Sequence, residues 1–217
     1  VTFDPIKDFA PISLVDKSPN VIAVHPSVQA NTLRELIALA KARPGVLNWS
    51  SGNNGSPGHL AGELFKIMAG VDIVRIAYKS GSQETTDLLA GRVQIAFSPA
   101  GSLMPHVKTG KLRALAIGAD KPSSLTPGVP TTLEAGLPGY EIGSMHAVFA
   151  PAGTPPAIIN RINQEMVRFL KLPETREKLL VYSVEPVGST PEELSVYVKA
   201  DMARLGKVIK SLGIRAE

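Results

Sequence analysis

Short blocks of apolar residues recur along the chain with two different periods, and these periods predict a mixed α/β fold. Continuous apolar runs bounded by turn residues predict strands at 9–15, 21–24, 46–50, 73–78, 93–97, 112–117 and 147–150. Apolar residues at helical spacing predict helices at 32–42, 59–69, 83–90, 103–108, 157–170, 173–180 and 191–212. Strand, short loop and helix alternate through the middle of the chain, which is typical of a doubly wound, largely parallel sheet.

Two local signals refine this assignment. Lys17-Ser18-Pro19-Asn20 has turn composition and predicts a break between the first two strands. Thr190-Pro-Glu-Glu193 predicts a helix start, with Thr as the N-cap, Pro at the first position and Glu at the third.

The alternating pattern divides the chain into lobes. Residues 22–119 predict one nearly self-contained α/β lobe. From Asp120 to Gly143 four prolines and four glycines interrupt both the helical and the strand spacing of apolar residues. This predicts a long connector. We therefore expect 1–21 and 120–217 to be parts of the first lobe, and 22–119 to be the complete second lobe. A chain that leaves one lobe, builds another and returns has the plan of a two-lobed binding fold with a ligand cleft.

One loop has the composition of an anion site. Ser50-Ser51-Gly52-Asn53-Asn54-Gly55-Ser56-Pro57-Gly58 joins a predicted strand to a predicted helix. Its glycines allow close approach of a ligand, and the helix start offers free N–H groups to an anion. It is neither a Walker A loop nor a dinucleotide fingerprint, and the chain has no nucleophile elbow. The alternative interpretation is an ordinary glycine-rich turn.

Two further strand-to-helix loops favour the anion site. They are Ser80-Gly81-Ser82 and Ser98-Pro99-Ala100-Gly101-Ser102, and Lys79 stands beside the first of them. Loops of this kind gather at the carboxyl ends of parallel strands, where ligands bind. Three hydroxyl-rich helix starts at one edge predict a carboxylate or phosphate site, which Lys79 could assist.

Charge and composition agree with a small anionic ligand. The chain has 217 residues and a net charge of +4. Residues 22–119 hold 10 Lys and Arg against 5 Asp and Glu, so the positive excess lies in the predicted complete lobe. The basic residues are scattered singly, which argues against nucleic-acid binding. No apolar run is long enough for a membrane span, and the absence of cysteine excludes thiolate metal sites, disulfides and a thiol nucleophile.

The remaining titratable residues give weaker signals. His59 and Glu63 are four residues apart on a helix, but no third metal ligand lies near, so we expect no metal site. His146 adjoins a predicted strand; it could face the cleft and bind ligand, or it could have a structural role. No nucleophile and base are spaced along the sequence in a way that indicates a catalytic pair. We therefore expect neither catalytic residues nor a cofactor.

Long motifs across the chain resemble the Bug-type receptors of the tripartite tricarboxylate transporter family. The first two are Asp4-Pro-Ile-Lys-Asp-Phe-Ala-Pro-Ile12 and Trp49-Ser-Ser-Gly-Asn-Asn-Gly-Ser-Pro-Gly-His-Leu-Ala-Gly-Glu-Leu-Phe65. The others are Pro105-His-Val-Lys-Thr-Gly-Lys-Leu-Arg-Ala-Leu-Ala116, Val129-Pro-Thr-Thr-Leu-Glu-Ala-Gly-Leu-Pro-Gly-Tyr140 and Ala150-Pro-Ala-Gly-Thr-Pro155. They follow the family's order over essentially the whole chain.

The resemblance implies a type II periplasmic-binding fold that captures a small mono- or dicarboxylate between two lobes. It also implies a periplasmic location and delivery of the solute to membrane transporter subunits, without membrane insertion of the receptor itself. The resemblance further implies that ligand carboxylates meet main-chain amides, hydroxyls and ordered water more than arginine side chains. The residues that this implies as ligand-binding are Ser51, Gly52, Asn53, Lys79, Ser80, Gly81 and Ser98.

The chain departs from the family in three places. Relatives often have an Asp-Asn pair at Ser98-Pro99 and aromatic residues at Met145-His146, so the ligand is expected to differ. Relatives also have a signal peptide and a sizeable segment before the Asp4 motif. We therefore expect the N-terminal part of the first lobe to be missing from this chain and its affinity for ligand to be weak or absent. An enzyme acting on an anionic substrate and a ligand-sensing regulatory domain are alternative functions for the same two-lobed fold.

Overall fold

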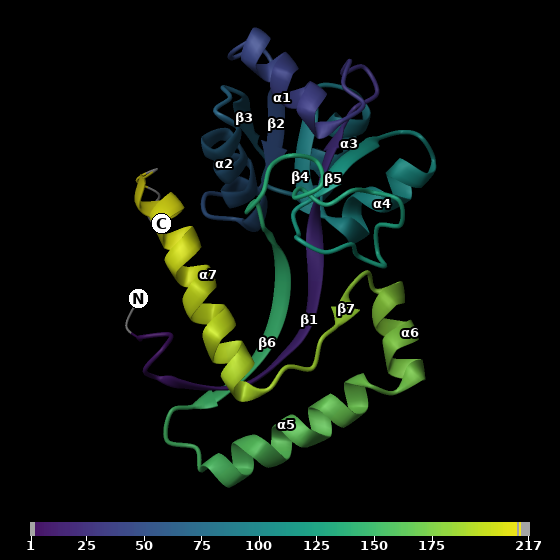
Figure 1. The fold of residues 1–217 in the computed structure, drawn as a ribbon. Coiled ribbons are helices and arrows are strands. Elements are labelled where there is room, and N and C mark those ends of the chain that lie inside the picture. Colours follow the sequence, from purple (N-terminus) through teal and green to yellow (C-terminus); the bar gives the residue numbers. More distant parts are fainter. Residues whose placement is uncertain (1–2, 212, 214–217) are drawn as a thin grey trace. The chain divides into compact units, whose positions relative to one another are not determined.

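A computed structural model describes residues 3–211 and 213 (Figure 1). The described residues form two compact units. Unit 1 contains 3–18 and Met145–Lys207, and unit 2 contains Pro19–Ser144 together with 208–211 and 213. The fold is mixed α/β, with seven helices and one sheet of seven strands among the described residues.

The centre of unit 2 is a five-stranded arrangement in the order β3-β2-β4-β1-β5. Its strands are β1 (Phe9–Val24), β2 (Asn48–Ser51), β3 (Val74–Ala77), β4 (Ile95–Pro99) and β5 (Arg113–Ile117). β2 is parallel to both β3 and β4, whereas β1 runs antiparallel to β4 and β5. β2, β3 and β4 therefore end at the same edge. The predicted parallel arrangement is confirmed for these three strands, but the antiparallel β1 makes the sheet mixed.

Helices pack on both faces of this sheet. They are α1 (Leu33–Ala42), α2 (Pro57–Ala69), α3 (Gly81–Leu89) and α4 (Ala100–Lys108). Val21 and Ala96 point into an aliphatic core with Leu88 and Leu103 from α3 and α4. On the other face Phe97 packs against Trp49 and Phe65, where α2 lies. The alternation of strand side chains thus gives each face its own core.

The sheet does not have the predicted break at Lys17–Asn20. β1 continues through these residues as one strand of 16 residues. Its pairing with β7 (Glu185–Pro186) ends at Lys17, and its pairing with β4 begins at Asn20. Pro19, which has no N–H to donate, falls between these two ladders, so the turn composition did not require a turn at this point.

The proline-rich segment 120–143 lies in unit 2, whereas the sequence led us to expect it in the incomplete lobe. It contains no helix, but the expectation of an unpacked connector is wrong, because the segment continues the edge of the sheet and is partly buried. Thr132 N donates to Ile117 O at 2.9 Å, and Ile142 N donates to Gly118 O at 3.0 Å. The buried Tyr140 hydroxyl donates to Ala61 O at 3.0 Å. These contacts follow from main-chain pairing and tertiary packing, which composition does not reveal.

Unit 1 contains the first part of β1 with β6 (Gly143–Pro151), β7, α5 (Pro156–Leu170), α6 (Pro173–Val181) and most of α7 (Pro191–Ser211). Ser189 holds this unit together: its carbonyl accepts from Ser13 Oγ at 2.8 Å and from Asn163 Nδ2 at 2.7 Å. The predicted capping box is confirmed, since Thr190 Oγ1 accepts from Glu193 N and Glu193 Oε2 accepts from Thr190 N. Within the described residues, every helix is too short or too polar to cross a membrane.

Candidate functional site

The register of the parallel strands brings the three predicted loops to one level. Ser51 pairs with Ala77 of β3, and Ser50 pairs with Ala96 of β4. Ser98 comes two residues after Ala96 on β4, so it lies close to Ser51 at the end of the neighbouring strand. The chain then enters α2 and α3 through short loops, whereas β4 passes directly into α4, so the predicted loop 98–102 is the end of β4 and the first turn of α4. We call the segments 50–56, 79–82 and 98–102 the strand-end site.

Each segment of the strand-end site leads into a helix N-terminus, but the three helix starts differ in capping. Ser56 Oγ caps α2 by accepting from His59 N, and Ser80 Oγ caps α3 by accepting from Gln83 N. α4 begins after Pro99 with no side-chain cap. The first-turn N–H groups of a helix have no partner within the helix, and the helix dipole adds positive potential there. The site therefore presents amide donors and partial positive charge from three directions.

Arg75 of β3 fixes the shape of the first loop. Its guanidinium donates to Ser51 Oγ at 2.6 Å, to Gly52 O at 2.7 Å and to Asn54 Oδ1 at 2.7 Å. Ser51 Oγ in turn donates to Gly52 O at 3.1 Å. Partial burial lowers the pKa of Arg75, although the group stays charged at any physiological pH. The sequence did not single out this residue.

His59 holds the second half of the same loop. Its ring is buried, stacks on Trp49 and accepts the Gly55 N–H at Nδ1, at 3.0 Å. Burial is the largest cause that lowers the pKa of His59, and the Arg75 charge adds to it. This arrangement requires a neutral ring, because a protonated Nδ1 cannot accept a hydrogen bond.

We expect this loop to lose stability in acid. Protonating His59 is harder in the folded chain than in the unfolded chain, so unit 2 loses stability progressively as the pH falls below about 6.5. The measurement is urea unfolding of the wild type and of His59→Gln between about pH 8 and pH 5, the range over which histidine side chains usually change charge. The variant should show a smaller decrease over this range; equal decreases would contradict the assignment.

A carboxyl group also belongs to the strand-end site. Glu84, on the first part of α3, accepts from Ser50 Oγ at 3.0 Å and from Ser98 Oγ at 3.4 Å. Its own burial is the largest cause that raises the pKa of Glu84, and the two serine hydrogen bonds oppose it. Nothing in the sequence distinguishes Glu84 from the other carboxylates of predicted helices.

The structure distributes the predicted ligand residues unevenly. Ser51, Gly52, Asn53, Lys79, Ser80, Gly81 and Ser98 come together in unit 2. His146 lies in unit 1 on β6, where its exposed ring contacts the buried Asp16 through Nδ1 and Oδ1 at 2.7 Å. That contact gives His146 a structural partner. Its role toward a ligand stays a prediction.

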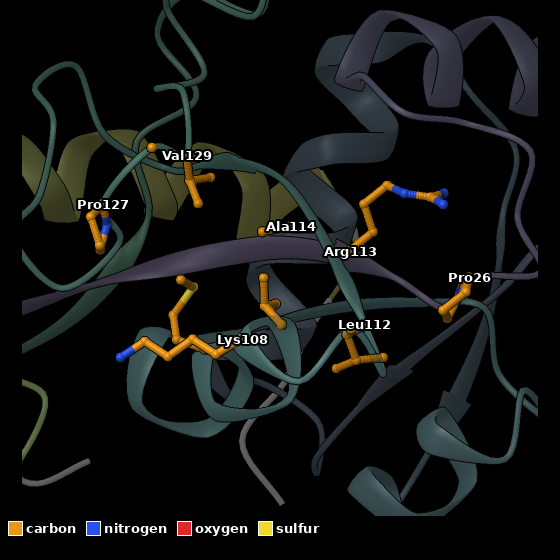
Figure 2. A pocket seen from close by; sticks show the side chains of 11 residues that line it. Pro26, Lys108, Leu112, Arg113, Ala114, Pro127 and Val129 are labelled. Atoms are coloured by element: carbon orange, nitrogen blue, oxygen red, sulfur yellow. The ribbon is translucent and has the colours of Figure 1, made fainter.

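A separate cavity of about 550 Å³ lies beside α4 and β5 (Figure 2). Its walls come from the end of α4, the start of β5 and the loop 127–129, with Pro26, Lys108 and Leu112 among the lining residues. None of the residues predicted for ligand binding lines it. Within residues 3–211 and 213, no group of three His, Asp or Glu is placed to hold a metal ion.

The family follows from comparison with known sequences. The profile of the tripartite tricarboxylate transporter family receptor matches residues 1–214. The chain belongs to this receptor family. Its relatives include the protein BugT of Bordetella pertussis, which is 32% identical over 215 residues; the match covers 99% of this chain and 66% of BugT. The chain thus spans slightly less than two thirds of that relative.

Solved structures of similar proteins have the same fold. The R. palustris protein Rpa4515 with adipate has a TM-score of 0.81 and 36% identity, covering 98% of this chain and 71% of that one. MatC from Rhodopseudomonas palustris with bound malate has a TM-score of 0.77 and 26% identity, covering 96% of this chain and 72% of that one. The predicted resemblance and the α/β periplasmic-binding fold are confirmed.

Proposed function

We propose that this chain is the solute-capturing part of a periplasmic receptor, and that the strand-end site binds a carboxylate of a small organic solute. The observation that carries the proposal is that three adjacent parallel strands end in one place on three helix N-termini. Such an edge is the usual ligand site of parallel α/β sheets. Amide donors and helix dipoles favour an anionic group there.

The chemistry of the loops suits a carboxylate. Gly52 and Gly81 carry no side chain that would keep a ligand from the backbone, and Ser80 and Ser98 add hydroxyls nearby. Arg75 donates hydrogen bonds to three oxygen atoms of the loop, so we propose that it fixes the shape of the loop. The main-chain amides and the hydroxyls would then contact the ligand. Lys79 is exposed beside α3 and adds positive charge.

Relatives support the same function. The family is one of transporter receptors, the similar protein BugD is described as a periplasmic binding protein, and two other similar proteins are solved with adipate and with malate. For this chain we propose binding without catalysis, delivery of the solute to membrane transporter subunits, and a periplasmic location.

The test is a ligand-observed NMR titration of the protein against mono-, di- and tricarboxylates. This method registers a Kd of about 1 mM or tighter, so even modest affinity is detected. Native mass spectrometry then gives the number of solute molecules bound. Saturable binding of one carboxylate per chain supports the proposal. Failure of every carboxylate to bind would contradict it.

Gly81→Ala tests whether the ligand approaches the backbone of α3. A Cβ at Gly81 meets nothing within 4 Å, so we expect stability to be unchanged or slightly higher. The added methyl group lies at the helix start and should weaken carboxylate binding by about tenfold. Gly153→Ala in unit 1, where a Cβ also meets nothing within 4 Å, is the matched control and should leave affinity unchanged. Equal affinities of the two variants would exclude close approach at Gly81.

A further inference from the structure

Glu84 places an acidic oxygen in the middle of the strand-end site. Ser50 Oγ and Ser98 Oγ both donate to Oε1, from the ends of β2 and β4. Ser50 is fully buried, and Glu84 itself is half-buried. The two serines hold the carboxyl group at the edge where the parallel strands end. Within the part of the chain that the structure describes, the other oxygen, Oε2, accepts no hydrogen bond.

No cation among the described residues compensates the charge of Glu84. Its pKa is affected by burial and by the two serines, and no basic side chain lowers it. Lys79 makes no ion pair with it in the same part of the chain. Asp87, three residues further along α3, has its own partners: it accepts from Arg92 at 2.8 Å and from the Tyr78 hydroxyl at 3.0 Å. Carboxylates are almost never fully buried without a partner, and a half-buried one with no cation beside it presents negative charge to whatever binds at this edge.

We propose that Glu84 is the specificity-determining residue of the strand-end site, selecting a solute that carries a positively charged amine as well as a carboxylate. The proposal rests on the proposed function, because the solute carboxylate is taken to bind the helix starts. Glu84 then provides the acceptor for the ammonium group. The solute class is therefore an amino acid in the broad sense, in preference to a plain di- or tricarboxylate.

Electrostatics gives the direction of this preference. Two unit charges a few ångströms apart near a protein surface interact by an amount that changes affinity at least about tenfold. An ammonium group gains this attraction from Glu84. A second carboxylate in place of the ammonium group is repelled by Glu84, unless one of the two carboxyl groups is protonated. A hydroxyl group would gain a hydrogen bond but no charge attraction.

The experiment compares solutes that share one carboxylate and differ only at the other end. The pairs are β-alanine and succinate, 4-aminobutyrate and glutarate, and 5-aminopentanoate and adipate. Affinities are measured by NMR titration at constant ionic strength for the wild type, Glu84→Gln and Asp72→Asn. Glu84→Gln keeps an oxygen acceptor for both serines, so it removes the charge and leaves the serine contacts in place. Asp72 is exposed before the start of β3, away from the strand-end site, and its replacement removes the same charge.

In the wild type and in Asp72→Asn, we expect the amino member of the best pair to bind at least about tenfold tighter. Glu84→Gln should abolish that preference and improve binding of the dicarboxylate. Wild-type preference for dicarboxylates, or a preference that Glu84→Gln leaves unchanged, overturns the role of Glu84 and leaves carboxylate binding intact. If no solute of either kind binds any variant, the proposed function itself fails.

Discussion

Gly62→Ala is expected to destabilise unit 2 strongly, although it adds only one methyl group. A Cβ at Gly62 would overlap the ring of Trp49, which is fully buried and packs edge-on against Phe97. Neither the ring nor the helix can retreat without disturbing the aromatic core. Overpacking of this kind costs about 3 kcal/mol, which for a chain of this length lowers Tm by about 6–12 °C.

The matched control is Gly206→Ala on α7. Gly206 is also helical, and a Cβ there meets nothing within 4 Å. Replacing a helical glycine by alanine at an open position stabilises by about 0.5–1 kcal/mol. Both variants are measured by thermal and urea unfolding followed by circular dichroism. Similar Tm values for the two variants would show that Gly62 and Trp49 do not approach each other so closely.

Arg75→Met should give the second large effect. The change keeps a long apolar stem and removes the guanidinium, so Ser51, Gly52 and Asn54 each lose a hydrogen-bond donor. We expect a loss of about 2–3 kcal/mol in the free energy of unfolding. Because the freed loop no longer holds its backbone in one position, carboxylate affinity should fall at least about tenfold.

Arg92→Met is the control for the loss of an arginine. The Arg92 side chain is exposed and pairs with Asp87, which is the kind of surface ion pair that contributes about 0–1 kcal/mol. Urea unfolding and carboxylate titration are done on both variants. Wild-type stability and affinity in Arg75→Met would show that Arg75 does not shape the site.

Periodicity predicted most helices because their signals are local. The helix 33–42 is an example: Thr32 Oγ1 accepts from Glu35 N, and the apolar residues fall on the buried face. Strand limits that depend on pairing could not be read in this way. β6 begins four residues before its predicted start, and the two-residue β7 was not predicted, since both are defined by the partner strand β1.

The same distinction divides the candidate site. The serine and glycine loops are visible in the sequence because each directly follows an apolar run. Arg75 and Glu84 reach the site across the sheet: Arg75 bonds residues that precede it by 21 to 24 positions, and Glu84 bonds Ser50 and Ser98 on two other strands. Such contacts depend on strand order and register, which a single sequence does not specify.

Trp49 is the chain's single tryptophan, so intrinsic indole fluorescence comes from one known place in unit 2. Its indole N–H is buried without a hydrogen-bond partner among the described residues, and its ring stacks on His59. Its neighbours Ser50 and Ser51 begin the strand-end site. The unlabelled protein therefore carries its own optical reporter: emission at short wavelength when folded, a red shift on unfolding, and an intensity sensitive to changes at His59 and in the adjoining loop.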